Sequence, residues 1–221
     1  MQRRIRSTAC GLLSLLLGGL SLARAQTPPA PAHNPQAQAH RDVADALEAK
    51  YDYAGAITEY QAAHQLDKAN HLGDAAMDLC NIGVDYYHLS QYDKAIGCFQ
   101  QALPIQREIN NRYGEASALN NLGVVYSHLS QYDKAIGFFQ QALSIQRAVK
   151  DRAGEATALN NVGLAYYHLS RYDKAIDFYQ QALSIQREIN DREGEAVTLS
   201  SLGLAQRHLS QHDKGISADT K

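Results

Sequence analysis

The sequence predicts an all-α solenoid of antiparallel helix pairs, about four to five repeats long, with the last repeat incomplete. The 221-residue chain repeats itself every 40 residues, and Gly83, Gly123, Gly163 and Gly203 mark this period without drift. Apolar residues recur at helical spacing in two segments of each repeat, which predicts two helices per unit. Four of the five prolines lie within residues 28–35, so the remainder of the chain is free to be helical.

Residues 1–25 have the composition of a secretory signal peptide. Three arginines among the first six residues precede an apolar run over residues 12–22. The Ala-Arg-Ala of residues 23–25 predicts cleavage before Gln26. The apolar run is shorter than the ~20 residues of a membrane-spanning helix, although an uncleaved anchor is the alternative. We therefore expect a bacterial protein that is exported to the periplasm or secreted, without membrane attachment after cleavage.

The part that follows the signal peptide is acidic. Removing residues 1–25 removes four arginines and no acidic residue, which takes the formal net charge from −2 to −6. This balance argues against binding to nucleic acid or to an anionic membrane, both of which need a basic surface. Residues 26–38 are rich in Pro and Ala without a helical apolar pattern, and they predict a flexible linker.

The first repeat-like segment, residues 39–75, is divergent, and only its second half matches the later units. The close repeats are expected at residues 76–115, 116–155 and 156–195, followed by a partial repeat at 196–221. In each of them Ser-x-x-Asp resembles a capping box that would begin the second helix. The pairs are Ser90/Asp93, Ser130/Asp133, Ser170/Asp173 and Ser210/Asp213.

Other residues predict where further helices begin and break. Asp151 and Asp191 are suited to cap the first helices that follow them. Pro104 falls inside a predicted second helix and is expected to kink or restart it. In the last repeat the usual Tyr, Tyr and Ala are replaced by Gln206, His212 and Gly215. Because solenoids need a polar terminal cap, either the chain is truncated, or a partner or a second copy covers this end.

Position by position, the repeats resemble the tetratricopeptide pattern. In the second close repeat the matching residues are Leu122-Gly123, Tyr126, Tyr132, Ala135, Phe139 and Ala142. The period exceeds the usual 34 or so residues, as it does in the similar Pins-type and kinesin-light-chain-type arrays. The chain also resembles exported cyanobacterial repeat proteins, which often continue into a caspase-like peptidase domain. The resemblance implies a right-handed superhelix with a concave groove lined by the first helices.

One face of each first helix is uncharged, although a solvated helix face usually carries Lys and Glu. The resemblance places this face in the groove, and we take it as the candidate surface for a protein or peptide partner. We call its residues the first-helix stripe. The candidate binding residues are Asn81, Val84, Tyr87 and His88; Ser117, Asn121, Val124 and His128; and Thr157, Asn161, Leu164, Tyr167 and His168.

The asparagines of this stripe form an expected ladder. An Asn amide offers two donors and an acceptor, so it can pair with a peptide backbone without reading side chains. The kinesin-light-chain groove is similar, which implies that Asn81, Asn121 and Asn161 grip an extended peptide. The alternative is that these amides bond between neighbouring helices. The Lys residues of the chaperone-type carboxylate clamp are absent, so a C-terminal carboxylate ligand is not expected.

No constellation for chemistry occurs in the sequence. Equivalent histidines on successive repeats stand ~10 Å apart, too far to share a metal ion whose ligands lie ~2 Å away. We expect them to pack at helix ends, with a pH-responsive groove as the alternative. Cys80 and Cys98 have no metal-type spacing, and we expect packed or free thiols. Phosphate-loop, nucleophile-elbow and metal motifs are lacking, so the sequence predicts no metal and no cofactor.

These observations predict a non-enzymatic scaffold outside the cytoplasm that binds a peptide or helix of another protein. The alternative is the regulatory repeat region of a multidomain enzyme whose peptidase-like domain has been lost. A third interpretation is a repeat protein that self-associates through its uncapped C-terminal end.

Overall fold

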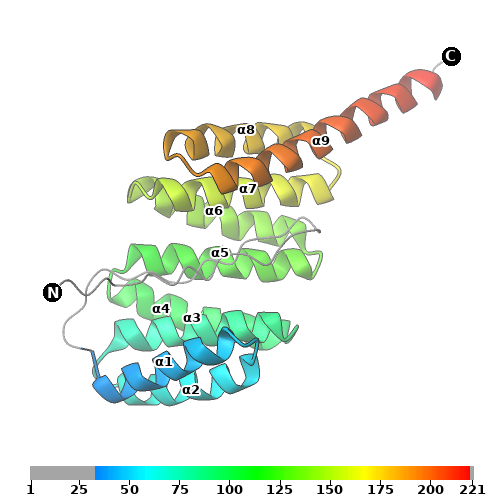
Figure 1. Cartoon of the computed structure of the whole chain (residues 1–221). Coiled ribbons are helices and arrows are strands. Elements are labelled where there is room, and N and C mark those ends of the chain that lie inside the picture. Colours follow the sequence, from blue (N-terminus) through cyan, green and yellow to red (C-terminus); the bar gives the residue numbers. More distant parts are fainter. Residues whose placement is uncertain (1–32, 220–221) are drawn as a thin grey trace.

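The computed structural model describes residues 33–219 and, among them, the side chains of residues 33–211. This part of the chain forms α-helices and no strand (Figure 1). The helices are α1 (Pro35–Glu48), α2 (Tyr53–Asp67), α3 (Leu72–His88), α4 (Tyr92–Glu108), α5 (Arg112–His128), α6 (Tyr132–Ala148), α7 (Arg152–His168), α8 (Tyr172–Glu188) and α9 (Arg192–Asp219). The expected signal peptide, and the expected linker up to residue 32, lie outside the described residues.

Consecutive helices pack against each other throughout, and each odd-numbered helix from α3 onward also contacts the next odd-numbered one. Figure 1 shows the helices stacked in chain order, with α1 and α2 at one end of the stack and α8 and α9 at the other. The predicted all-α solenoid is therefore confirmed. No helix among residues 33–219 is long and apolar enough to cross a membrane.

Close contact between the two helices of a repeat depends on a glycine facing a buried ring. The ring of Phe139 on α6 is fully buried and lies against Gly123 on α5. A Cβ added at Gly123 would lie 2.4 Å from this ring, closer than atoms in contact allow. Gly83 faces Phe99 and Gly163 faces Tyr179 in the same way. Small residues are thus needed where the two helices meet.

The turn inside each repeat is built differently from the predicted capping box. Ser130 has a positive φ of 58° and ends α5 rather than beginning α6. Its amide donates to the Ser127 carbonyl at 2.9 Å, and the Gln131 amide donates to the Tyr126 carbonyl at 2.8 Å. These bonds satisfy carbonyls at the helix end in the manner of a Schellman motif. The capping-box prediction was wrong, because a Ser just after a helix also fits its C-terminal turn.

The turns between repeats agree with the predicted caps. Asp151 accepts a hydrogen bond from the Gly154 amide at 2.9 Å, and Asp191 accepts one from Gly194 at 2.9 Å. Just beyond these caps, an ion pair 2.8 Å long joins each second helix to the next first helix. The pairs are Arg107–Glu115, Arg147–Glu155 and Arg187–Glu195.

Several expected boundaries need correction. The first helices begin at Leu72, Arg112 and Arg152, so the repeat boundaries expected at residues 76, 116 and 156 fall inside helices. Helix α1 begins at Pro35, because Asn34 caps it and proline suits the first helical turn. The segment before the helix therefore ends at Asn34, four residues earlier than residue 38.

Two expected breaks do not occur. Helix α4 continues through Pro104 to Glu108 without restarting. Helix α9 continues through Ser210 to Asp219, where the other repeats turn into a second helix, and Figure 1 shows it projecting beyond α8. At the positions of Tyr132 and Ala135 this repeat carries His212 and Gly215.

The first repeat is held by buried charges as well as by apolar contacts. Arg41 on α1 is 3% exposed, while Asp67 and Asp78 are fully buried. The Arg41 guanidinium donates to both Asp78 oxygens at 2.7 and 2.8 Å and also bonds to Asp67. One cation on α1 thus joins the end of α2 to α3.

Candidate functional site

The structure places the first-helix stripe on three helices that contact one another in order, α3, α5 and α7. The stripe is not uniformly open. Its side chains near the start and middle of each helix are buried, and the histidines at the helix ends are exposed. The buried members are Asn81, Val84, Ser117, Asn121, Val124, Asn161 and Leu164; Thr157, Tyr87 and Tyr167 are partly buried; His88, His128 and His168 are exposed.

The buried apolar members of the stripe belong to the core. Val84 packs in a cluster with Leu79 and Cys80, and Val124 packs with Phe139 and Val162. The expectation that these valines line an open groove is therefore corrected. They are covered because neighbouring first helices pack closely enough to enclose the side chains between them.

One asparagine of the stripe takes the alternative role considered from the sequence, bonding between neighbouring helices. The Asn161 amide on α7 donates to the Asn120 carbonyl oxygen on α5 at 3.1 Å, so this pair bonds between neighbouring helices. The carbonyl oxygen of Asn81 is buried and has no hydrogen-bond partner, and the same holds for the Ser127 hydroxyl. An unpaired buried acceptor is costly to the folded state. Peptide binding by Asn81 and Asn121 stays a prediction.

The histidines at the ends of the first helices pack on tyrosines of the preceding second helix, which confirms their expected packing role. Tyr53 stacks on His88 with ring centroids 4.7 Å apart, and Tyr172 stacks on His208 at 5.4 Å. Tyr92 approaches His128 at 6.1 Å with planes tilted by 31°. Each repeat is thus joined to the next by a tyrosine–histidine contact at the same edge of the stack. We call this row of contacts the tyrosine–histidine edge.

Tyr87 strengthens this edge. Its hydroxyl hydrogen-bonds to Nε2 of His128 at 2.6 Å, which links the end of α3 to the end of α5. Burial raises the pKa of the Tyr87 hydroxyl to about 12, so it stays protonated as a donor. Burial, and in second place the nearby charge of His168, lower the pKa of His128 below its usual value. Neutral imidazoles therefore suit this edge better than charged ones.

The described residues contain no group of three or more His, Cys, Asp or Glu side chains that could hold a metal ion. Cys80 and Cys98 are buried, and neither takes part in a disulfide. The structure therefore shows free, packed thiols at both positions, as expected from the sequence.

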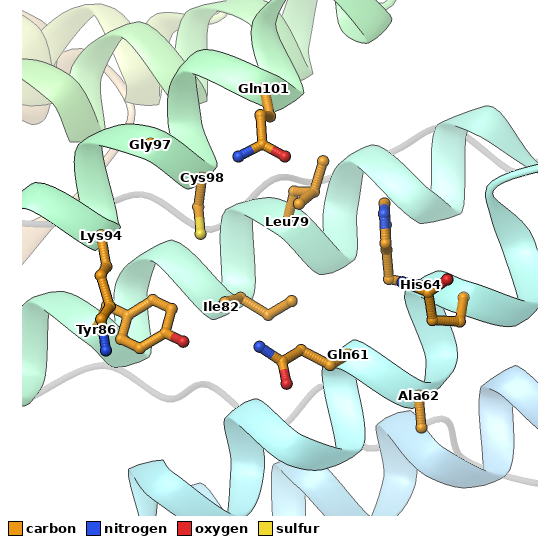
Figure 2. A pocket seen from close by; sticks show the side chains of 11 residues that line it. Gln61, Ala62, His64, Leu79, Ile82, Tyr86, Lys94, Gly97, Cys98 and Gln101 are labelled. Atoms are coloured by element: carbon orange, nitrogen blue, oxygen red, sulfur yellow. The ribbon is translucent and has the colours of Figure 1, made fainter.

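One feature of the structure was missed from the sequence. A cavity of about 630 Å³ lies between the second helices α2 and α4, above the first helix α3. Figure 2 shows Ile82 between Gln61 and Cys98, with Tyr86 and Lys94 toward one end and His64 toward the other. The signal for it was available, since Cys98 stands where the next two repeats carry Phe138 and Phe178.

The last helix exposes apolar residues where earlier repeats bury theirs. Val197 and Leu204 on α9 are 47% and 40% exposed, whereas the equivalent Ser117 and Val124 on α5 are 7% and 0% exposed. The difference arises because α5 has first-helix neighbours on both sides, whereas the described chain supplies α9 only with α7. This face of α9 is thus the open side of the stack.

The stacked helix pairs, the glycine–ring contacts and the 40-residue period together define a helical repeat protein of the solenoid class. The tetratricopeptide repeat profile matches residues 73–148 and 154–217, and the chain belongs to this family. No relative was found among curated protein sequences.

Solved structures share the fold. Aspartyl phosphate phosphatase F from Bacillus subtilis aligns with 83% of the chain at 16% identity and a TM-score of 0.70. A Rap protein complexed with Competence and Sporulation Factor aligns with 83% at 20% identity and a TM-score of 0.67. A putative kinesin light chain from Podosopora anserina aligns with 81% at 13% identity and a TM-score of 0.66.

The extent of these matches differs. The alignment spans 89% of the kinesin light chain structure, but only 50% of the phosphatase and 52% of the Rap protein. At these identities the likeness shows the fold alone.

Proposed function

We propose that the protein is a non-enzymatic scaffold that binds a peptide or helix of another protein on the first-helix stripe. The observation that carries the proposal is the uncharged character of this stripe in every close repeat. Tetratricopeptide arrays present preformed surfaces of this kind, so little conformational entropy is lost on binding. The Rap protein captured with a bound factor has the same fold.

The accessible part of the stripe indicates where contact begins. His88, His128 and His168 are exposed, and Tyr87 and Tyr167 lie beside them at the helix ends. Aromatic and imidazole rings supply large contact areas with few rotatable bonds, which suits a binding surface. The unpaired Asn81 oxygen lies about two helical turns further in on α3. A bound segment would thus lie across the helix ends, and it would reach the buried Asn81 oxygen only if α3 and its neighbours moved apart.

We further propose that this binding takes place outside the cytoplasm. The support for this location is the signal-like composition of residues 1–25. Fusing these residues to a reporter enzyme that is active only after export tests it directly. A reporter that stays inactive would contradict export.

The binding proposal is tested by affinity capture from the native host, with captured proteins identified by mass spectrometry and then titrated in purified form. The variant His128→Glu with His168→Glu adds charge to the stripe and should weaken binding at least tenfold. A matched control, Gln140→Glu with Gln180→Glu, adds the same charge to exposed positions of the second helices. Equal affinity of both variants for the partner would overturn the proposed surface.

A second copy of the chain is the alternative partner, and the exposed Val197 and Leu204 on α9 favour it. Contact between two such faces would bury the apolar area that α9 leaves open. Light scattering over a range of protein concentrations tests this: the native chain should grow in mass, and Val197→Glu with Leu204→Glu should stay monomeric. A native chain that is monomeric throughout would contradict self-association.

A further inference from the structure

The cavity between α2 and α4 has an apolar floor and polar walls. Leu79 and Ile82 of α3 form the floor, while Gln61 of α2 and Gln101 of α4 stand on opposite walls (Figure 2). Its volume of about 630 Å³ lies within the range of small-ligand sites. The cavity shares no residue with the first-helix stripe, since it lies between second helices.

Comparison with the next two repeats explains why the cavity exists. Forty residues on, Phe138 occupies the position of Cys98, and its ring stacks on Tyr126 with centroids 5.3 Å apart and planes inclined by 4°. Another forty residues on, Phe178 stacks on Tyr166 at 5.5 Å and 17°. In both repeats the phenyl ring reaches and stacks on the tyrosine that corresponds to Tyr86. The cysteine side chain is too short to do so.

The remaining parts of the arrangement are unchanged. The Lys94 ammonium lies 5.1 Å from the centre of the Tyr86 ring, as Lys134 lies 4.9 Å from Tyr126. Tyr86 is therefore held as its counterparts are, with a cation over its ring. The repeat of Tyr86 lacks only the second aromatic ring, which lies parallel to the tyrosine in the next two repeats.

We propose that this cavity binds an aromatic side chain of a protein partner, stacked on Tyr86 as Phe138 is stacked on Tyr126. In the next two repeats the chain itself places a phenyl ring, Phe138 or Phe178, at the equivalent position. The floor of Leu79 and Ile82 takes the apolar ring edge, and the amides of Gln61 and Gln101 are placed to bond the backbone that carries the ring. The Lys94 charge polarises Tyr86 and favours an offset parallel stack.

The test uses N-acetyl-phenylalaninamide as the probe and N-acetyl-leucinamide as the aliphatic control. Both are titrated into the isotope-labelled full chain, and amide and methyl shifts are followed by NMR. The aromatic probe should move the signals of Ile82, Tyr86 and Cys98, and the aliphatic one should move them at least threefold less at equal concentration.

Two variants sharpen the test. Cys98→Phe supplies the missing ring from within and should abolish the shifts at Ile82 and Tyr86. Phe138→Cys removes the ring from the next repeat and should create a second site, seen as new shifts at Leu122 and Tyr126. If Cys98→Phe does not fold, the native chain and Phe138→Cys still decide the outcome.

The proposal fails if the aromatic probe leaves Tyr86 unmoved up to its solubility limit, or if the leucine probe binds equally well. It also fails if the shifts persist in Cys98→Phe. The stripe variant His128→Glu with His168→Glu should bind the aromatic probe normally. A failure of this site is thus distinguishable from a failure of the proposed scaffold function.

Discussion

Tyr132 and His168 stack face to face, with ring centroids 5.1 Å apart and planes inclined by 8°. The pair joins the second helix of one repeat to the first helix of the next. Burial lowers the pKa of His168, as it does that of His128, because the charged ring loses solvation in this stack. The contact between repeats is therefore sensitive to protonation.

We expect thermal stability to fall as the pH is lowered from 7.5 to 5.5. The unfolded chain binds protons at the usual histidine pKa of about 6.5, above that of the folded state, so protonation favours unfolding. Both rings are exposed in part, so screening limits the effect, and we expect a decrease in Tm of ~2–4 °C. Calorimetry across this pH range measures it. His128→Gln with His168→Gln should flatten the profile, and an unchanged profile would contradict the assignment.

The Gly123–Phe139 contact predicts that Gly123→Ala destabilises the protein. The added methyl group would lie 2.4 Å from the buried ring, and overpacking of this kind costs about 1–3 kcal/mol. Urea denaturation measures the change. Gly137→Ala is the matched control on the partner helix, because nothing lies within 4 Å of its added Cβ. This control should gain about 0.5–1 kcal/mol from helix propensity, and a loss at both sites would refute the contact argument.

The buried ion pairs of Arg41 predict that replacing this residue lowers the stability of the fold strongly. Arg41→Ala leaves the carboxylates of Asp67 and Asp78 buried without their cation, and removing one partner of a buried pair costs about 3–5 kcal/mol. The loss should appear in α1 to α3 first, as faster hydrogen exchange there than in α5 to α8. Arg171→Ala removes a 3.9 Å pair with Asp133 on the exposed surface and should change stability by less than about 1 kcal/mol.

The positive φ of Ser130 predicts that glycine improves this position. A residue with a Cβ loses roughly 1–2 kcal/mol of stability in the left-handed conformation, and glycine removes this cost. Glycine also makes the unfolded chain more flexible, which lowers the stability by about 0.5–1 kcal/mol. Ser130→Gly should therefore stabilise the chain slightly. Ser144→Gly, in the interior of α6, should destabilise it by about 0.5 kcal/mol. A reversed order of the two melting temperatures would show that the turn geometry is wrong.

The cysteines predict slow thiol chemistry. Burial raises the pKa of Cys80 to about 12 and that of Cys98 to about 11, so little thiolate forms near neutral pH. In the chain cleaved before Gln26, both thiols should react with a disulfide reagent at pH 8 far more slowly than in urea. Cys98 should react before Cys80, which is fully buried; the opposite order, checked with Cys80→Ser, would contradict this.

The sequence was sufficient for the architecture, because a fixed 40-residue period and two helical stripes leave few other ways to bury the apolar faces. It was insufficient for the turns. Ser130 and Asp133 fit both a helix start and a helix end, and only the backbone conformation at Ser130 separates the two.

The placement of the candidate residues on one helix face was predicted, whereas their exposure was predicted only in part, and their role in binding stays a prediction. The spacing of Asn121, Val124 and His128 places them on one helix face, as the structure has them. Whether a neighbouring first helix covers such a face depends on the distance between repeats. The residue pattern within one helix gives no information on that distance. The cavity beside Cys98 could have been inferred by comparing Cys98 with Phe138, since a small residue at a position of large ones leaves space.

The helices touch chiefly those beside them in the stack, from α1 to α9. Among the described helices no contact reaches further than two helices along the stack, so a mechanical pull between the two ends of the stack would be carried largely through successive interfaces in series. Such a chain would lengthen in steps, the weakest boundary opening first, and would behave as a spring whose compliance grows with each added repeat.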